Sequence, residues 1–204
     1  MQSESFDTLY ENDSNVIISA PTAAGKTVLL ELALVWNFLS SWDPTENWAV
    51  YLAPIKALCS EKFDEWQWKF SSSLGINVVE CTGDSDYTNW RELDSAAIIV
   101  ATPEKWDSLT WKWKENQKLI GSLSLILVDE VHTIGDKSWG ATLEVVLSRL
   151  LTLWSIETFK NKTLSQLRII AISATIPNIE DLSLWLKCPK FLWFDEQYRP
   201  VKIK

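Results

Sequence analysis

Short apolar runs alternate with longer amphipathic stretches along the whole chain. The runs predict strands at residues 15–19, 49–52, 77–81, 98–101, 125–129, 168–173 and 191–194. The stretches between them predict helices at residues 26–39, 55–74, 104–112, 141–153 and 179–186. Several runs are apolar at every position, which is typical of a parallel sheet covered on both faces. The pattern therefore predicts an α/β three-layer sandwich with a mostly parallel sheet, and ligands at the carboxyl ends of its strands.

A candidate phosphate-binding loop follows the first predicted strand. Its residues are Ala20, Pro21, Thr22, Ala23, Ala24, Gly25, Lys26 and Thr27. Gly25, Lys26 and Thr27 can wrap backbone N–H groups and one ammonium around nucleotide phosphates, with the Thr27 hydroxyl on Mg²⁺. Ala20 stands where the full P-loop pattern has glycine. The strand before the loop and the helical pattern after it nevertheless give the placement that a P-loop needs.

An acidic pair, Asp129 and Glu130, ends the strand predicted at residues 125–129. Asp129 can hold the same Mg²⁺, and Glu130 can orient or deprotonate the attacking water. The pair alone could be a solvated acidic turn, but its place after an apolar strand, downstream of a P-loop, favours a metal site. Together the two motifs predict a P-loop site that hydrolyses a nucleoside triphosphate.

Composition narrows the class of protein. A chain of 204 residues with 47% hydrophobic residues fits one globular domain, 1–204. No apolar run approaches the roughly 18 residues of a membrane span, so no membrane contact is expected. The net charge of −8 argues against a broadly basic surface but leaves room for a narrow nucleic-acid groove. The three cysteines lack metal-ligand spacing and predict reduced thiols in a cytosolic or nuclear protein.

Taken in order, the motifs resemble the first RecA-like domain of superfamily-2 nucleic-acid helicases. Within them they resemble the Ski-type group, whose DExH box corresponds here to Asp129, Glu130, Val131 and His132. The resemblance implies that Gln2 reads the adenine of ATP, that residues 20–27 bind ATP, and that Thr27 and Asp129 hold Mg²⁺. It also implies catalytic roles for Lys26, Asp129, Glu130 and His132. His132 is expected to couple the phosphate site to the Ser-Ala-Thr motif and not to bind metal, because Mg²⁺ prefers oxygen ligands.

Further segments resemble the parts of these helicases that grip nucleic acid and couple its movement to hydrolysis. The implied nucleic-acid contacts are Pro54, Lys56, Gly83, Asp84, Thr102, Pro103 and Glu104. The implied coupling residues are Ser173, Ala174 and Thr175. Backbone N–H groups at strand ends and helix starts can bind strand phosphates without reading bases, so contact with single-stranded nucleic acid is expected to be independent of sequence.

The amino-acid sequence between the motifs resembles that of the meiotic crossover-promoting DNA helicases of the group. That likeness implies ATP-driven translocation on single-stranded nucleic acid, in particular DNA, with a role in meiotic recombination and a nuclear location. An RNA helicase of the same group remains the alternative, because RNA-acting relatives share much of this sequence between the motifs. A small-molecule P-loop kinase would explain the loop but would leave the other motifs without a role.

Two departures from the group bear on activity. The chain ends at Lys204, before the second RecA-like domain with its arginine fingers, so it is expected to be a fragment with weak or no activity alone. Trp139 stands where the group has arginine, and Trp111 and Trp193 also look like arginine replacements among 13 tryptophans. We hypothesise a decaying gene copy or stop codons translated as tryptophan. A catalytically inactive nucleotide-binding fragment therefore remains a second hypothesis.

Overall fold

The computed structural model describes residues 1–10, 12–22, 24–40, 47–83, 93, 95–111, 114, 120–136, 140–155, 167–174, 176 and 178–199. A seven-stranded parallel sheet runs through them in the order β3-β4-β2-β5-β6-β1-β7. The strands are β1 Val16–Ser19, β2 Trp48–Leu52, β3 Val78–Cys81, β4 Ile98–Ala101, β5 Leu123–Val128, β6 Arg168–Ser173 and β7 Lys190–Trp193. Each predicted strand is present, within two residues at either end.

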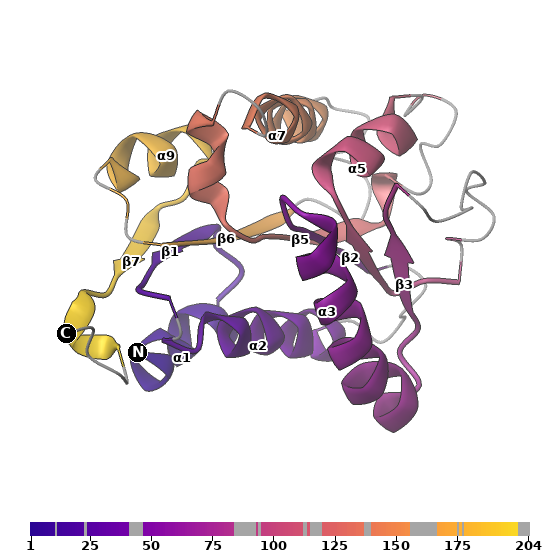
Figure 1. The fold of residues 1–204 in the computed structure, drawn as a ribbon, viewed down its shortest axis with the longest axis horizontal. Helices are drawn as coiled ribbons and strands as arrows, with labels where there is room; N and C mark the ends of the chain where they lie inside the picture. Colours follow the sequence, from indigo (N-terminus) through magenta and orange to yellow (C-terminus); the bar gives the residue numbers. More distant parts are fainter. Residues whose placement is uncertain are drawn as a thin grey trace.

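Helices cover both faces of the sheet (Figure 1). One face carries α1 (Gln2–Tyr10), α2 (Lys26–Leu39) and α3 (Lys56–Trp66), whose apolar side chains pack in one core cluster with β1, β2 and β5. The other face carries α5 (Pro103–Thr110), α7 (Gly140–Ser155) and α9 (Ile179–Trp185), which pack in a second cluster. The predicted three-layer α/β sandwich is confirmed.

The strand order divides the carboxyl edge of the sheet into two halves. The neighbouring strands β5, β6 and β1 end at the DExH box, the Ser-Ala-Thr motif and the P-loop. The neighbouring strands β3, β4 and β2 end at the segments expected to contact nucleic acid. The halves meet where β2 pairs with β5, and there the Asp129 N–H donates a 2.8 Å hydrogen bond to the Leu52 carbonyl.

The helices differ from their prediction in two places. Helix α1 was not predicted. The helix predicted at residues 55–74 is an α-helix only to Trp66 and continues as a π-helical turn, Gln67–Ser72. In this wider turn the Ser72 and Ser73 hydroxyls donate to carbonyls five residues earlier, those of Gln67 and Trp68. These side-chain bonds fit a π-turn, which periodicity does not reveal.

The tryptophans of the described chain range from wholly buried to largely exposed. Trp66 and Trp106 are wholly buried in the two core clusters. Trp68, Trp111 and Trp193 are exposed, but they follow α3, follow α5 and lie on β7, respectively, so these three do not share one stacking surface. Trp139 lies outside the described residues. No helix in the described ranges combines the length and apolar content needed to cross a membrane.

Candidate nucleotide and nucleic-acid site

The P-loop connects β1 to the start of α2. Gly25 adopts a left-handed conformation (φ 84°) just before the helix, which a side chain would make costly. Lys26 Nζ donates to the Ala20 carbonyl at 2.8 Å and to the Pro21 carbonyl at 3.3 Å. Burial lowers the pKa of Lys26, and this outweighs the opposing carboxylates of Glu130 and Asp129. The lysine therefore lies inside the loop, close to both acidic residues.

Helix α1 brings Gln2 to this loop. A Cβ atom on Gly25 would lie 2.8 Å from Gln2 Nε2, so the amide sits directly against the glycine. The far end of α1 is held by Arg168 of β6, whose guanidinium donates to the carbonyls of Thr8 (2.9 Å) and Leu9 (3.0 Å). Gln2, the residue predicted to read adenine, thus lies beside the P-loop. Of the loop residues not yet mentioned, Thr22, Ala24 and Thr27 are described, and Ala23 lies outside the described residues.

Asp129 and Glu130 follow β5 directly. The Asp129 carboxylate accepts a hydrogen bond from the Tyr51 hydroxyl (2.6 Å, Oδ2) and another from the Glu130 N–H (2.8 Å, Oδ1). Glu130 has a left-handed backbone (φ 49°), which is uncommon for a residue other than glycine and is often found at functional sites. Within the described chain, its buried Oε2 atom has no hydrogen-bond partner.

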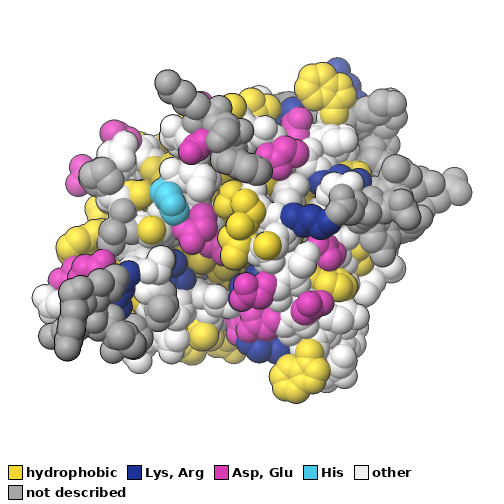
Figure 2. Space-filling model, in the orientation of Figure 1, with side chains coloured by type: hydrophobic (Ala, Val, Ile, Leu, Met, Phe, Trp, Pro, Cys, Tyr) yellow, Lys and Arg dark blue, Asp and Glu magenta, His cyan; other side chains and the backbone are white. Residues whose placement is uncertain are grey.

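His132 lies between the acidic pair and the Ser-Ala-Thr motif. Its Nδ1 is 3.3 Å from the Ser173 hydroxyl and 3.2 Å from Glu130 Oε2, the latter at ion-pair distance without hydrogen-bond geometry. Ala174 continues from the same strand, and its carbonyl accepts from the Ser19 hydroxyl at 3.2 Å. Thr175 lies outside the described residues. Figure 2 shows the only histidine of the chain, in cyan, exposed beside acidic side chains.

The segments expected to contact nucleic acid lie on the other half of the edge. Pro54 and Lys56 lead into α3, and Gly83 follows β3 at an exposed position. Thr102 caps α5 by accepting the Lys105 N–H, with Pro103 and Glu104 in the first turn. The N-termini of α3 and α5 are therefore both at this edge, where their N–H groups can meet phosphates. Asp84 lies outside the described residues.

Comparison with protein families matches residues 1–182 to the DEAD/DEAH box helicase family. The chain belongs to this family. It is 46% identical to the human "Probable ATP-dependent DNA helicase HFM1" and 42% identical to the "ATP-dependent DNA helicase MER3" of Saccharomyces cerevisiae, in both cases over all of this chain. It is 37% identical to the "DExH-box ATP-dependent RNA helicase DExH13" of Arabidopsis thaliana. The sequence-based assignment to the DExH helicases is confirmed.

The chain spans a small part of these helicases: 15% of the human relative and 16% of the yeast relative. Among solved structures, the DUF1998 helicase MrfA matches with a TM-score of 0.74 at 24% identity, covering 96% of this chain and 30% of that one. At this identity the likeness supports the fold alone. That fold is the three-layer α/β sandwich described above.

Two residues of this helicase domain were missed as site residues in the sequence. Tyr51 contacts Asp129 from β2, and its signal is a hydroxyl within an otherwise apolar strand. Burial, followed by the Asp129 charge and hydrogen bond, raises the pKa of Tyr51, so the phenol stays protonated. Arg199 donates to the Thr22 hydroxyl at 2.7 Å, across 177 residues of chain, and no local pattern reveals that contact.

The residues present fit Mg²⁺ bound with a nucleotide. Thr27 and Asp129 offer a hydroxyl and a carboxylate, the hard oxygen ligands that Mg²⁺ takes beside phosphates. In the described part of the chain, no group of three or more His, Cys, Asp or Glu residues forms a closed metal site. Glu130 Oε2 makes no hydrogen bond within the described chain and can accept one from a water molecule.

Proposed function

We propose that this chain is the ATP-binding motor domain, the first RecA-like domain, of a longer ATP-dependent helicase that translocates on single-stranded nucleic acid. The observation that carries the proposal is the contact of His132 with both Glu130, just after β5, and Ser173, the last residue of β6. Strand β6 pairs with β1, which leads into the P-loop. A nucleotide site alone does not need this link. A motor does, because hydrolysis must be coupled to movement.

The side chains divide the work of binding and hydrolysis. Lys26 can exchange the carbonyls of Ala20 and Pro21 for phosphate oxygens, which are stronger acceptors for an ammonium. Thr27 and Asp129 would hold Mg²⁺, which neutralises charge developing on the phosphates. Glu130 would accept a proton from the attacking water at Oε2. Gln2, at the P-loop glycine, would contact the adenine ring.

Nucleic acid would lie across the ends of β3, β4 and β2. The N-termini of α3 and α5 would donate to strand phosphates, which gives binding without base recognition. Lys56 is exposed and can add charge. The chain as a whole carries a net charge of −8, so this groove would be a local exception on an acidic molecule.

We propose DNA as the substrate, with a role in meiotic recombination and a nuclear location. The chain is 46% and 42% identical to two relatives named DNA helicases, and 37% identical to one named an RNA helicase. The sequence between the motifs also resembles that of the meiotic subgroup. An RNA-acting helicase of the same group is the alternative.

The test is ATP turnover by the full-length protein that contains this chain, with and without single-stranded DNA or RNA. Glu130→Gln should keep nucleotide binding and stop turnover, whereas Glu180→Gln, an exposed change on α9, should leave turnover at the wild-type rate. DNA should stimulate turnover more than RNA does. Binding without any turnover in the wild type would favour the inactive nucleotide-binding protein, and normal turnover by Glu130→Gln would refute the catalytic assignment.

A further inference from the structure

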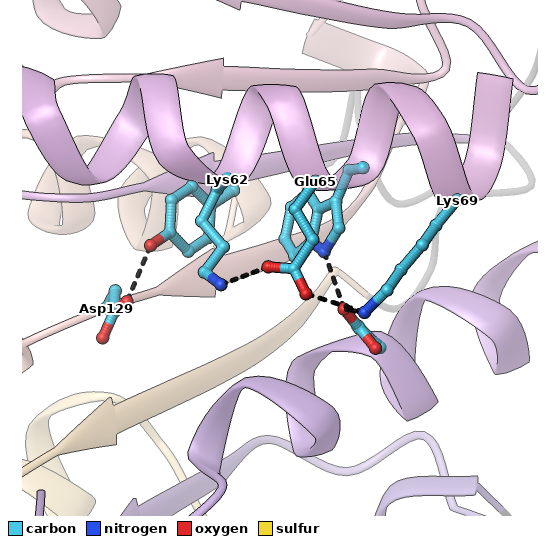
Figure 3. Close-up of polar contacts among 7 residues, drawn as sticks. Lys62, Glu65, Lys69 and Asp129 are labelled. Atoms are coloured by element: carbon cyan, nitrogen blue, oxygen red, sulfur yellow. Dashed lines mark hydrogen bonds and ion pairs between the residues drawn. The ribbon is translucent and has the colours of Figure 1, made fainter. Parts of the chain in front are cut away.

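A connected set of side chains leads from Asp129 into the core of the domain (Figure 3). The Tyr51 hydroxyl donates to Asp129 Oδ2 at 2.6 Å, and the Glu130 N–H donates to Oδ1 at 2.8 Å. Tyr51 is wholly buried on β2, the strand that pairs with β5. Each oxygen of the carboxylate therefore has one fixed donor, and the carboxylate is held in one orientation.

The Tyr51 ring is itself held by Trp66 of α3. The two rings form an edge-to-face pair with centroids 5.1 Å apart, a geometry that aromatic rings prefer. Trp66 has no exposed surface, and its indole N–H donates to Glu31 Oε1 at 3.1 Å. The phenol cannot move away from Asp129 without displacing an indole that is both packed and hydrogen-bonded.

Glu31 belongs to α2, four residues after Thr27, so the two side chains lie on the same face of that helix. Lys69 also holds Glu31, with Nζ 2.8 Å from Oε1, and the same ammonium is 2.7 Å from Glu65. Glu65 in turn pairs with the buried Lys62 (Figure 3). These ion pairs fix Glu31, and Glu31 fixes Trp66.

We propose that Tyr51 is a positioning residue that sets the Asp129 carboxylate relative to Thr27, with Trp66 and Glu31 completing the connection. The inference rests on the proposed function, in which Thr27 and Asp129 share one Mg²⁺. One buried indole then connects the two ligand positions. It reaches Asp129, just after β5, through Tyr51 of β2, and it reaches α2, which carries Thr27, through Glu31. Because Trp66 ends α3, the same indole also ties the helix at the nucleic-acid half of the edge to the metal carboxylate.

The test is the Mg²⁺ dependence of ATP binding by the full chain, measured with a fluorescent ATP analogue. Tyr51→Phe removes one hydroxyl and should raise the Mg²⁺ concentration for half-maximal binding by about tenfold, as expected for the loss of a hydrogen bond to a charged group. Binding in excess EDTA should stay at the wild-type level. Tyr10→Phe, the same chemical change on α1, is the matched control and should match the wild type in both measurements.

A cycle with Asp129→Asn separates positioning from general stability. If Tyr51 acts through Asp129, Tyr51→Phe should add no further Mg²⁺ effect in the Asp129→Asn background. Trp66→Phe gives a second route if Tyr51→Phe does not fold. It keeps the Tyr51 hydroxyl but removes the bond to Glu31, and should shift the Mg²⁺ dependence in the same direction by a smaller factor.

A Tyr51→Phe chain with wild-type Mg²⁺ dependence would overturn the inference, and so would equal effects of Tyr51→Phe in the two backgrounds. ATP binding by the wild type that does not respond to Mg²⁺ would overturn it too, while leaving the P-loop assignment in place. A wild-type chain that binds no nucleotide at all would contradict the proposed function itself, and the inference with it.

Discussion

His132 and Ser173 join the ends of two neighbouring strands, with Nδ1 of the imidazole 3.3 Å from the serine hydroxyl. Ser173→Ala removes this contact without touching the P-loop. In the full-length protein we expect unchanged ATP affinity and up to about a tenfold loss of DNA-stimulated turnover, the scale of one side-chain hydrogen bond. Steady-state ATPase assays with and without DNA provide the measurement.

The control for that change is Ser183→Ala. Ser183 is also buried, and its hydroxyl donates to the Cys188 carbonyl at 2.8 Å, away from the edge of the sheet. This variant should lose some stability but keep its stimulation by DNA. If DNA stimulated turnover equally in wild type, Ser183→Ala and Ser173→Ala, the His132 contact would not couple ATP hydrolysis to DNA binding.

Two glycines with positive φ allow a matched test of the P-loop. Gly25→Ala and Gly75→Ala should each cost about 1 kcal/mol in the free energy of unfolding, because both positions are left-handed (φ 84° and 70°). Only Gly25→Ala should also weaken ATP binding, since its Cβ would lie 2.8 Å from Gln2 Nε2, whereas the site at Gly75 is open. Urea unfolding and nucleotide titration give the two numbers. Equal ATP affinity in both variants would contradict the placement of Gln2.

Arg168→Met tests whether β6 holds α1 in place. The guanidinium donates to the carbonyls of Thr8 and Leu9, at the C-terminal end of α1, and to the carbonyl of Ser14, just before β1. Arg168→Met would leave these three acceptors without their donor. We expect about 2–4 kcal/mol of destabilisation in urea unfolding. The variant should also lose part of its preference for ATP over GTP, because Gln2 lies at the other end of the same helix. An unchanged preference in a destabilised variant would contradict the idea that Arg168 places Gln2 through α1.

Glu65 should make the domain sensitive to acid. Burial raises the pKa of this carboxyl, but hydrogen bonds from Lys62 and Lys69 outweigh it and hold the pKa below its ordinary value of 4.5. A carboxyl with a lowered pKa stabilises the fold fully above 4.5, and this stability is lost as the pH falls through the folded-state value. Thermal unfolding of Glu65→Gln should therefore show a lower Tm than wild type at neutral pH and a smaller difference below pH 4.5.

Glu61→Gln is the matched control for Glu65→Gln, because Glu61 is exposed on the same helix. Its Tm difference from wild type should be small at either pH. If the Tm difference of Glu65→Gln did not shrink on acidification, the ion pairs with Lys62 and Lys69 would not account for the acid sensitivity of the fold.

The sequence predicted the parts of the fold that local patterns determine. Every apolar run became a strand, and α2 has the predicted bounds, because buried parallel strands and an amphipathic helix show in composition and spacing. Helix α1 was missed because it buries only Ser5 and Leu9, and its C-terminal carbonyls are capped by Arg168, more than 150 residues away. The order of the strands was likewise invisible locally.

The candidate site divides in the same way. The P-loop and the DExH box were found because each is a contiguous pattern, and the strand order brought them together. Tyr51 and Arg199 were missed because their partners, Asp129 and Thr22, are distant in sequence. The roles given to the catalytic, metal-binding, nucleic-acid-binding and coupling residues stay predictions, which the variants above test.

The division of the sheet edge has a consequence for genetics. Missense alleles at the ends of β1 and β6 should abolish ATP binding or hydrolysis. Alleles at the ends of β3 and β4 should weaken nucleic-acid binding. The two classes of allele should therefore cause two different biochemical defects. Alleles at Tyr51 and Leu52, where β2 meets β5, should show both defects together, so a screen for separation of function would find its mutants on either side of that strand pair.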